Sequence, residues 1–110
     1  MRITSELFVA QLTRRLFQDG EFATVIRRGA EAAGAIFIVA RSREGGLRLF
    51  GPAVQSLFEE DGLRRFMEEP ANDDAALEAR FLREARFDPD FWVIEIETAE
   101  PERFLEIVEG

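Results

Sequence analysis

The chain has 110 residues, a size typical of one folded domain, and we expect residues 1–110 to form a single domain. Its formal net charge of −8, from 14 basic and 22 acidic residues, argues against binding to nucleic acid or to an anionic membrane, because both attract cationic proteins. The sequence has no His, Cys, Lys or Tyr, so it cannot supply an imidazole base, a thiol nucleophile, a Schiff-base amine or a phenol acid.

The remaining reactive side chains are carboxylates and arginines, and they restrict the chemistry that the chain could support. An enzyme of this composition would depend on Asp and Glu together with a cation such as Mg²⁺, and it could not build a zinc site from His or Cys. We therefore expect no cofactor and favour a non-enzymatic function over an enzymatic one.

The distribution of apolar residues bears on where the protein resides. No apolar run of signal-peptide length follows the N-terminal sequence MRITSE, and no stretch approaches about 18 consecutive apolar residues. We therefore expect a soluble cytoplasmic protein with no membrane partner.

The first predicted element is a helix that begins at Ser5 or Glu6 and ends at Gln18. Ser5 is a suitable N-cap, and Gly20 is a suitable stop signal. Apolar residues recur at helical spacing and predict one buried face, formed by Phe8, Val9, Leu12 and Leu16.

Three strands are predicted after this helix. The segment Phe22–Arg28 also fits a helical turn, and we favour a strand because of its β-branched residues. The apolar run in Ala35–Arg43 is typical of a central strand that is buried on both faces. Leu47–Pro52 follows it as the returning strand of a hairpin.

The hairpin loop determines which residues of the two strands share a face. If Glu44 and Gly45 form a two-residue loop, Arg41 lies opposite Arg48. One face then carries Ile36, Ile38, Ala40, Leu47 and Leu49, and the other carries Phe37, Val39, Arg41, Arg43, Arg48 and Phe50.

The segment Ala53–Asn72 has the least regular pattern, and we expect irregular chain with a short helix near Leu63–Met67. Asn72 is a suitable N-cap for a second long helix. That helix is expected to end near Phe87, because Pro89 disfavours helical geometry at the residue before it.

The C-terminal part is predicted to contain one strand and one helix. Phe91–Thr98 alternates as a strand does, and Pro101 can start a closing helix over Glu102–Val108. The predicted fold is therefore α+β, in the order α-β-β-β-α-β-α, with helices packed on a mostly antiparallel sheet of about four strands.

Two blocks of the chain resemble the bacterial family known as "domain of unknown function 1491". The first block is Phe22–Val39, with an Arg-Gly pair followed by Ala-Gly-Ala. The second is Arg83–Glu97, in which residues 86–92 carry the Arg-Phe-Asp-Pro-Asp-aromatic-Trp pattern of the family. The resemblance implies a small bacterial domain, and it implies no reaction, ligand or partner.

The second block predicts a structural joint between the long helix and the strand that follows it. Asp88-Pro89 is typical of a turn, in which Asp88 accepts hydrogen bonds from the backbone ahead of it. Arg86 could pair with Asp88 or Asp90, and Trp92 is expected to point into the core. The alternative is that Asp88 and Asp90 hold Mg²⁺ or form an acid–base pair.

An apolar patch is predicted on the sheet face opposite to Ile36 and Leu49. Such a patch is rarely left bare on a soluble monomer, so a helix of the chain or another molecule should cover it. We expect an interaction surface here for a homodimer or an unknown protein partner, formed by Phe37, Val39, Phe50, Phe91 and Val93.

Charged residues surround this patch and allow three interpretations. They are Arg41, Arg43, Arg48, Glu95 and Glu97. They could form a surface charge ladder, since carboxylates would neutralise the arginines across the sheet. The arginines could instead bind a small anionic ligand, or the two glutamates could serve a Mg²⁺-dependent enzyme.

Overall fold

The computed structural model describes residues 3–53 and 64–109. In chain order, the elements of this part are α1 (Ser5–Gln18), β1 (Phe22–Arg27), β2 (Ile36–Arg41), β3 (Leu47–Pro52), β4 (Arg65–Glu69), α2 (Asp74–Phe87), β5 (Trp92–Glu97), the short 3₁₀ helix η1 (Pro101–Arg103) and β6 (Glu106–Ile107).

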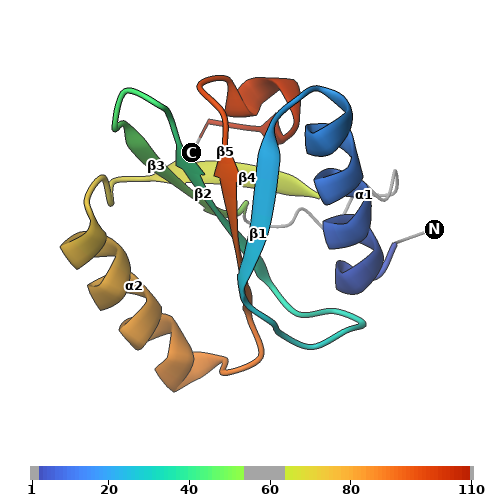
Figure 1. Ribbon diagram of the computed structural model, residues 1–110. Helices are drawn as coiled ribbons and strands as arrows, with labels where there is room; N and C mark the ends of the chain where they lie inside the picture. The colour runs from blue at the N-terminus through green and yellow to red at the C-terminus, as the bar shows by residue number, and fades with distance from the viewer. Residues whose placement is uncertain (1–2, 54–63, 110) are drawn as a thin grey trace.

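The strands form one mixed sheet in the order β1-β5-β2-β3-β4-β6. β5 lies between β1 and β2, antiparallel to the first and parallel to the second. The pairs β2-β3 and β3-β4 are antiparallel, whereas β4 and β6 are parallel. The helix α1 packs on one face of the sheet and α2 on the other, so the fold has three layers (Figure 1).

The α+β class is confirmed, but the sheet is mixed and has six strands instead of about four mostly antiparallel ones. The short helix expected near Leu63–Met67 is wrong in its described part, because Arg65–Glu69 forms β4. The closing helix Glu102–Val108 is also wrong, since η1 ends at Arg103 and β6 follows. These apolar runs are too short for their periodicity to separate helix from strand, and pairing with neighbouring strands decides.

The remainder of the segment expected to be irregular includes residues 54–63, which lie outside the described residues. On the far side of this gap, the backbone of β4 is held by both neighbours. Phe66 lies opposite Pro52 of β3 and Ile107 of β6, and its carbonyl accepts a hydrogen bond from the Val108 amide at 2.8 Å. This pairing makes β4 a strand within the sheet.

Helix α1 has the predicted bounds but a different N-cap. The Thr4 hydroxyl accepts a hydrogen bond from the Leu7 amide at 3.1 Å, as an N-cap side chain does. Ser5 is the first helical residue; it is buried, and its Oγ donates to the Gly34 carbonyl at 2.5 Å. The sequence contains two adjacent hydroxyl residues that suit the cap, and the contact with Gly34 determines which of them it is.

Helix α2 also differs from the prediction only at its N-cap. Asp73, rather than Asn72, accepts from the Ala76 amide at 2.8 Å. The helix ends at Phe87 as expected, and Asp88 after it has an extended conformation.

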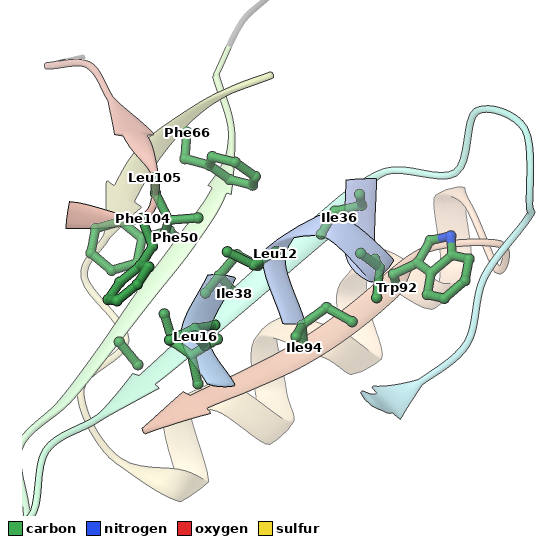
Figure 2. Packing of buried hydrophobic residues seen from close by; sticks show 13 residues of the cluster. Leu12, Leu16, Ile36, Ile38, Phe50, Phe66, Trp92, Ile94, Phe104 and Leu105 are labelled. Carbon is green, nitrogen blue, oxygen red and sulfur yellow. The ribbon is translucent and has the colours of Figure 1, made fainter. Parts of the chain in front are cut away.

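Two clusters of buried side chains lie on the two faces of the sheet. The α1-side cluster, shown in Figure 2, includes Val9, Leu12, Leu16, Ile36, Ile38, Ala40, Phe50, Phe66, Trp92, Ile94, Ile96, Phe104 and Leu105. The α2-side cluster consists of Phe37, Val39, Leu49, Leu77, Phe91 and Val93. In β2 and β5, alternate residues fall in different clusters, so the predicted alternation of these two strands is confirmed.

The register of the β2-β3 hairpin differs from the expected one by one residue. Arg41 lies opposite Leu47, and Ala40 lies opposite Arg48. The Ser42 amide donates to the Gly46 carbonyl at 3.0 Å, and Gly45 between them has a φ of 90°. The loop is therefore longer than two residues, and every side chain of β3 lies on the face opposite to the one predicted.

In the part of the chain that the structure describes, neither helix is both long enough and apolar enough to cross a membrane.

Candidate functional site

The predicted joint after α2 holds the loop between β1 and β2. The Asp88 carboxylate accepts from the Asp90 amide at 3.0 Å and closes the turn. The Asp90 carbonyl accepts from the Ala30 amide at 2.9 Å, and the Trp92 indole Nε1 donates to the Ala30 carbonyl at 2.8 Å. These contacts tie two segments together that lie about sixty residues apart in the chain.

Two glycines of the family pattern lie against this joint. A Cβ atom at Gly34 would lie 2.6 Å from the Asp90 carbonyl oxygen, and a Cβ atom at Gly29 would overlap the same oxygen and the Trp92 ring. Only glycine allows the loop to approach Asp90 and Trp92 this closely.

The arginine that stabilises the joint is Arg27, not Arg86. Arg27 donates to the Phe91 carbonyl at 3.2 Å and to the Pro89 carbonyl at 2.6 Å. Its guanidinium lies 4.2 Å from the centre of the Phe91 ring, which adds a cation–π contact. Among the described residues, Arg86 forms no ion pair with Asp88 or Asp90, which corrects that expectation.

The interaction surface expected on the sheet is buried within the chain. Phe37, Val39, Phe91 and Val93 are at most 3% exposed, and α2 covers them. Phe81 of α2 lies with its ring centroid 5.7 Å from that of Phe37. Four of the five residues do share a face, as expected, but a helix of the same chain is their cover.

The fifth residue of that expected surface is Phe50. It is fully buried on the α1 side, because the hairpin register reverses the faces of β3. The five residues therefore neither form one patch nor present a surface to solvent.

Arg41 and Arg48 lie on opposite faces of the sheet. Arg41 pairs with Asp74 at 2.5 Å and with Glu95 at 2.7 Å, on the α2 side. Its pKa is raised, chiefly by the hydrogen bonds to Asp74 and Glu95. Part of the predicted charge ladder is thus present, with Asp74 of α2 as an additional member.

Arg48 pairs with Glu68 of β4 at 2.8 Å and with Glu102 of η1 at 2.9 Å. The hydrogen bond from Arg48 lowers the pKa of Glu68. The pKa of Glu102 is also lowered, first by a backbone hydrogen bond and then by Arg48. The guanidinium of Arg48 is thus neutralised by two carboxylates, and it does not converge with Arg41 on a common anion site.

Arg43 and Glu97 line an open pocket of about 280 Å³ at the end of β5. The pocket is bordered by Glu21, Arg43, Glu44, Glu97, Thr98, Ala99, Glu100 and Arg103. Arg103 is already paired with Asp19 at 2.6 Å. Across residues 3–53 and 64–109, no group of three or more acidic side chains is arranged to hold a metal ion.

The edge of the sheet at β1 is an apolar surface that sequence reasoning missed. Ile26 is 58% exposed, Phe22 is 50% exposed and Val25 is 43% exposed. Phe17, from the last turn of α1, packs edge-on against the Phe22 ring at a centroid distance of 5.8 Å. We call Phe17, Phe22, Thr24, Val25 and Ile26 together the β1 edge.

β1 pairs with β5 on one side only and ends the sheet on the other. In Figure 1 it is the strand nearest the viewer, between the two helix layers, and no element crosses in front of it. The opposite end of the sheet is the two-residue strand β6, which is too short to offer a comparable edge. The sequence pattern does not single out this edge, because the adjacent apolar residues Val25 and Ile26 are also typical of a strand buried on both faces.

A β-bulge interrupts β1 near its end. The pairing with β5 passes from Val25 opposite Ile94 to Arg27 opposite Val93, so Ile26 is the extra residue. The bulge turns Arg27 onto the α2 side, where it covers Phe91, and leaves Ile26 at the surface.

The comparisons with known proteins agree on one family. The family described as "Protein of unknown function (DUF1491)" matches residues 3–106. The chain is 45% identical to protein Atu0922 from A. tumefaciens, whose solution structure has a TM-score of 0.87 over 100% of this chain and 98% of that one. It is 37% identical to a DUF1491 family protein from Caulobacter crescentus CB15, whose crystal structure has a TM-score of 0.78 over 100% of both chains. No curated protein matches the chain. The match over nearly the whole sequence shows that the chain belongs to the DUF1491 family.

Proposed function

We propose that this domain is a non-enzymatic protein-interaction module that binds its partner at the β1 edge. The observation that carries the proposal is the exposure of Phe22, Val25 and Ile26 on a strand with an unpaired side. Proteins that do not use such an edge usually blunt it with charges, proline or a covering segment.

The β1 edge suits a partner that adds a strand to the sheet. An extended segment beside β1 would form backbone hydrogen bonds with it, and these bonds supply affinity without depending on the partner's sequence. Contacts with Val25 and Ile26 would then select apolar side chains at the matching positions. Phe17 and Phe22, which pack edge-on against each other at the start of the strand, form an aromatic anchor of the kind that is common in interfaces.

The alternative of a small anionic ligand held by Arg41, Arg43 and Arg48 has less support. Arg41 and Arg48 lie on different faces of the sheet, and each is held by two carboxylates. A Mg²⁺-dependent site at Asp88 and Asp90 also has less support, because the Asp88 carboxylate is engaged by the Asp90 amide. The interaction module is thus the function that the geometry favours.

A selection of displayed random peptides tests the proposal. Peptides are selected on the wild-type domain and then measured against two variants, Ile26→Lys at the β1 edge and Leu82→Lys on α2. Leu82 is 62% exposed, so its replacement is a matched change at a distant surface. We expect extended peptides with alternating apolar residues.

These peptides should bind wild type and L82K alike and should bind I26K at least about tenfold more weakly, because an isoleucine buried at an interface contributes roughly 1.5–3 kcal/mol. Peptides that bind I26K as tightly as wild type would contradict the proposal.

A further inference from the structure

We propose that the partner at the β1 edge is a second copy of this chain, paired antiparallel about a twofold axis at Thr24. This inference rests on the proposed use of the β1 edge. It adds the identity of the partner and the register of the pairing.

The charges at the two ends of β1 favour an antiparallel copy. The strand is preceded by Glu21 and ends with Arg27, followed by Arg28. An antiparallel copy brings the acidic start of each strand beside the basic end of the other, and this happens twice in one dimer. A parallel copy would bring like charges together, which is unfavourable across a sheet. The edge is therefore complementary to itself, as a twofold interface requires.

The alternation of side chains restricts where the axis can lie. In an antiparallel pair, residues directly opposite each other point to the same face of the sheet. A twofold axis perpendicular to the sheet leaves each side chain on its own face. Directly opposed residues must therefore lie an even number of positions apart in the sequence, so one residue of β1 lies opposite its own copy across the axis. The residues of β1 that can lie on the axis near its middle are Ala23, Thr24 and Val25.

Thr24 satisfies both the charges and the apolar contacts. With the axis at Thr24, Ala23 lies opposite the partner's Val25, and Phe22 and Glu21 lie beside the bulged end of the partner's strand, which carries Ile26 and Arg27. With the axis at Ala23, Glu21 lies opposite Val25 instead, and with the axis at Val25, Arg27 lies opposite Ala23. Of the three, the axis at Thr24 is the one that brings Phe22 beside Ile26 and the acidic start of each strand beside the basic end of the other.

The contacts within each chain leave Arg27 available for the interface, whereas Arg28 already pairs with Glu6 and Glu31 of its own chain. Arg27 donates from Nε and Nη2 to the backbone of its own chain, so its Nη1 can still donate to Glu21 of the other copy. Thr24 is exposed and β-branched, and two threonines across a sheet form a favourable pair. The bulge at Ile26 ends regular pairing, so the regular part of the dimer interface is confined to residues 22–25.

The lack of cysteine in the sequence makes cross-linking a direct test. In Thr24→Cys, each chain carries one thiol, and the proposed axis places the two thiols opposite each other. Directly opposed residues have Cα atoms about 4.5–5.5 Å apart, within the range that a disulfide accepts. We expect T24C to form a covalent dimer at least about tenfold faster under mild oxidation than Glu78→Cys, a control on the exposed side of α2.

Two further variants test the register. Phe22→Cys and Ile26→Cys should each cross-link slowly alone, and a mixture of the two should give the mixed dimer preferentially. Thermal unfolding of each variant identifies any that fails to fold. Sedimentation should show a wild-type dimer and an I26K monomer.

The outcomes separate this inference from the proposed function. If T24C cross-links no faster than E78C and the wild type sediments as a monomer, self-pairing is wrong. If the selected peptides still distinguish wild type from I26K in that case, the β1 edge binds a different protein. If the peptides do not distinguish them either, both proposals fail.

Discussion

The sheet face under α2 and the β1 edge carry similar apolar side chains, but the chain itself covers only one of them. Phe37 and Phe91 on the first are almost fully buried beneath Phe81, whereas Phe22 and Ile26 on the second are at least half exposed. The composition of the two surfaces does not distinguish them. The difference comes from the position of α2, which packs over β2 and β5 and leaves the unpaired edge of β1 uncovered.

Replacement of a phenylalanine in each region should have the largest and most contrasting effect. Phe37→Ala should lower the free energy of unfolding by about 3–5 kcal/mol, because it leaves a cavity under α2. Phe22→Ala should lower it by less than about 1 kcal/mol, since that ring is half exposed and loses mainly its contact with Phe17. Urea denaturation measures both values. Equal losses in the two variants would remove the distinction between the regions.

The joint that connects the end of β1 with the turn after α2 should be the next most sensitive place. Gly29→Ala should lower the free energy of unfolding by roughly 1–3 kcal/mol, because the added Cβ overlaps backbone atoms of Asp90 and Phe91 that cannot move aside.

Gly46→Ala in the hairpin loop is the matched control for this joint. The nearest atom to its added Cβ is the Ser42 hydroxyl oxygen, which can rotate away. Thermal unfolding of both variants should give the larger loss for G29A. A G29A variant as stable as wild type would mean that the loop does not need its close approach to the joint.

Acid should weaken the ion pairs of Arg48, which lie apart from both regions. The folded protein lowers the pKa of Glu68 below its usual 4.5, so its contribution to stability is present above that pH. The contribution is lost as the pH falls through the lower, folded-state pKa. Both partners are partly exposed, so the loss should be only about 0.5 kcal/mol.

Denaturation of wild type and Arg48→Met between about pH 6 and pH 3 measures this loss. Arg43→Met is the control, because Arg43 has no ion pair among the described residues. We expect the difference in stability between wild type and R48M to shrink at acid pH, while the difference between wild type and R43M stays constant. The opposite pattern would assign the acid sensitivity to other carboxylates.

The smallest expected effect on stability is that of Ile26→Lys. An exposed residue at a bulge contributes little to the fold of a single chain, so the monomer should keep its stability within about 0.5 kcal/mol. Measurement at protein concentrations well below the dimerisation range isolates this value. A large loss would show that Ile26 belongs to the core, and the β1 edge would then resemble the face under α2.

Several features of the fold follow from local sequence alone. The bounds of α1, the end of α2 before Pro89 and the strand β3 agree with prediction, because capping residues, proline and apolar periodicity act over only a few neighbouring residues. The alternation of β2 and β5 is likewise local, since successive side chains of a strand point to opposite faces. The turn that Asp88 and Pro89 form belongs to the same group.

Other features depend on residues far apart in the chain. The sequence does not determine the hairpin register, because Gly45 and Gly46 allow more than one loop; the packing of Phe50 in the α1-side cluster and of Leu49 in the α2-side cluster selects one of them. β4 and β6 are strands because they pair with neighbours, not because of their own patterns. Arg27, not the nearer Arg86, stabilises the joint because the sheet brings β1 beside Pro89 and Phe91.

The sequence by itself determined the two long helices, which strands are apolar on both faces and which catalytic side chains are missing. Only the tertiary structure decided which apolar surface is covered and which is left at the edge. The physical reason is that apolar burial is non-directional: composition requires that rings be removed from water, but the packing of α2 on the sheet determines which rings are buried within the chain.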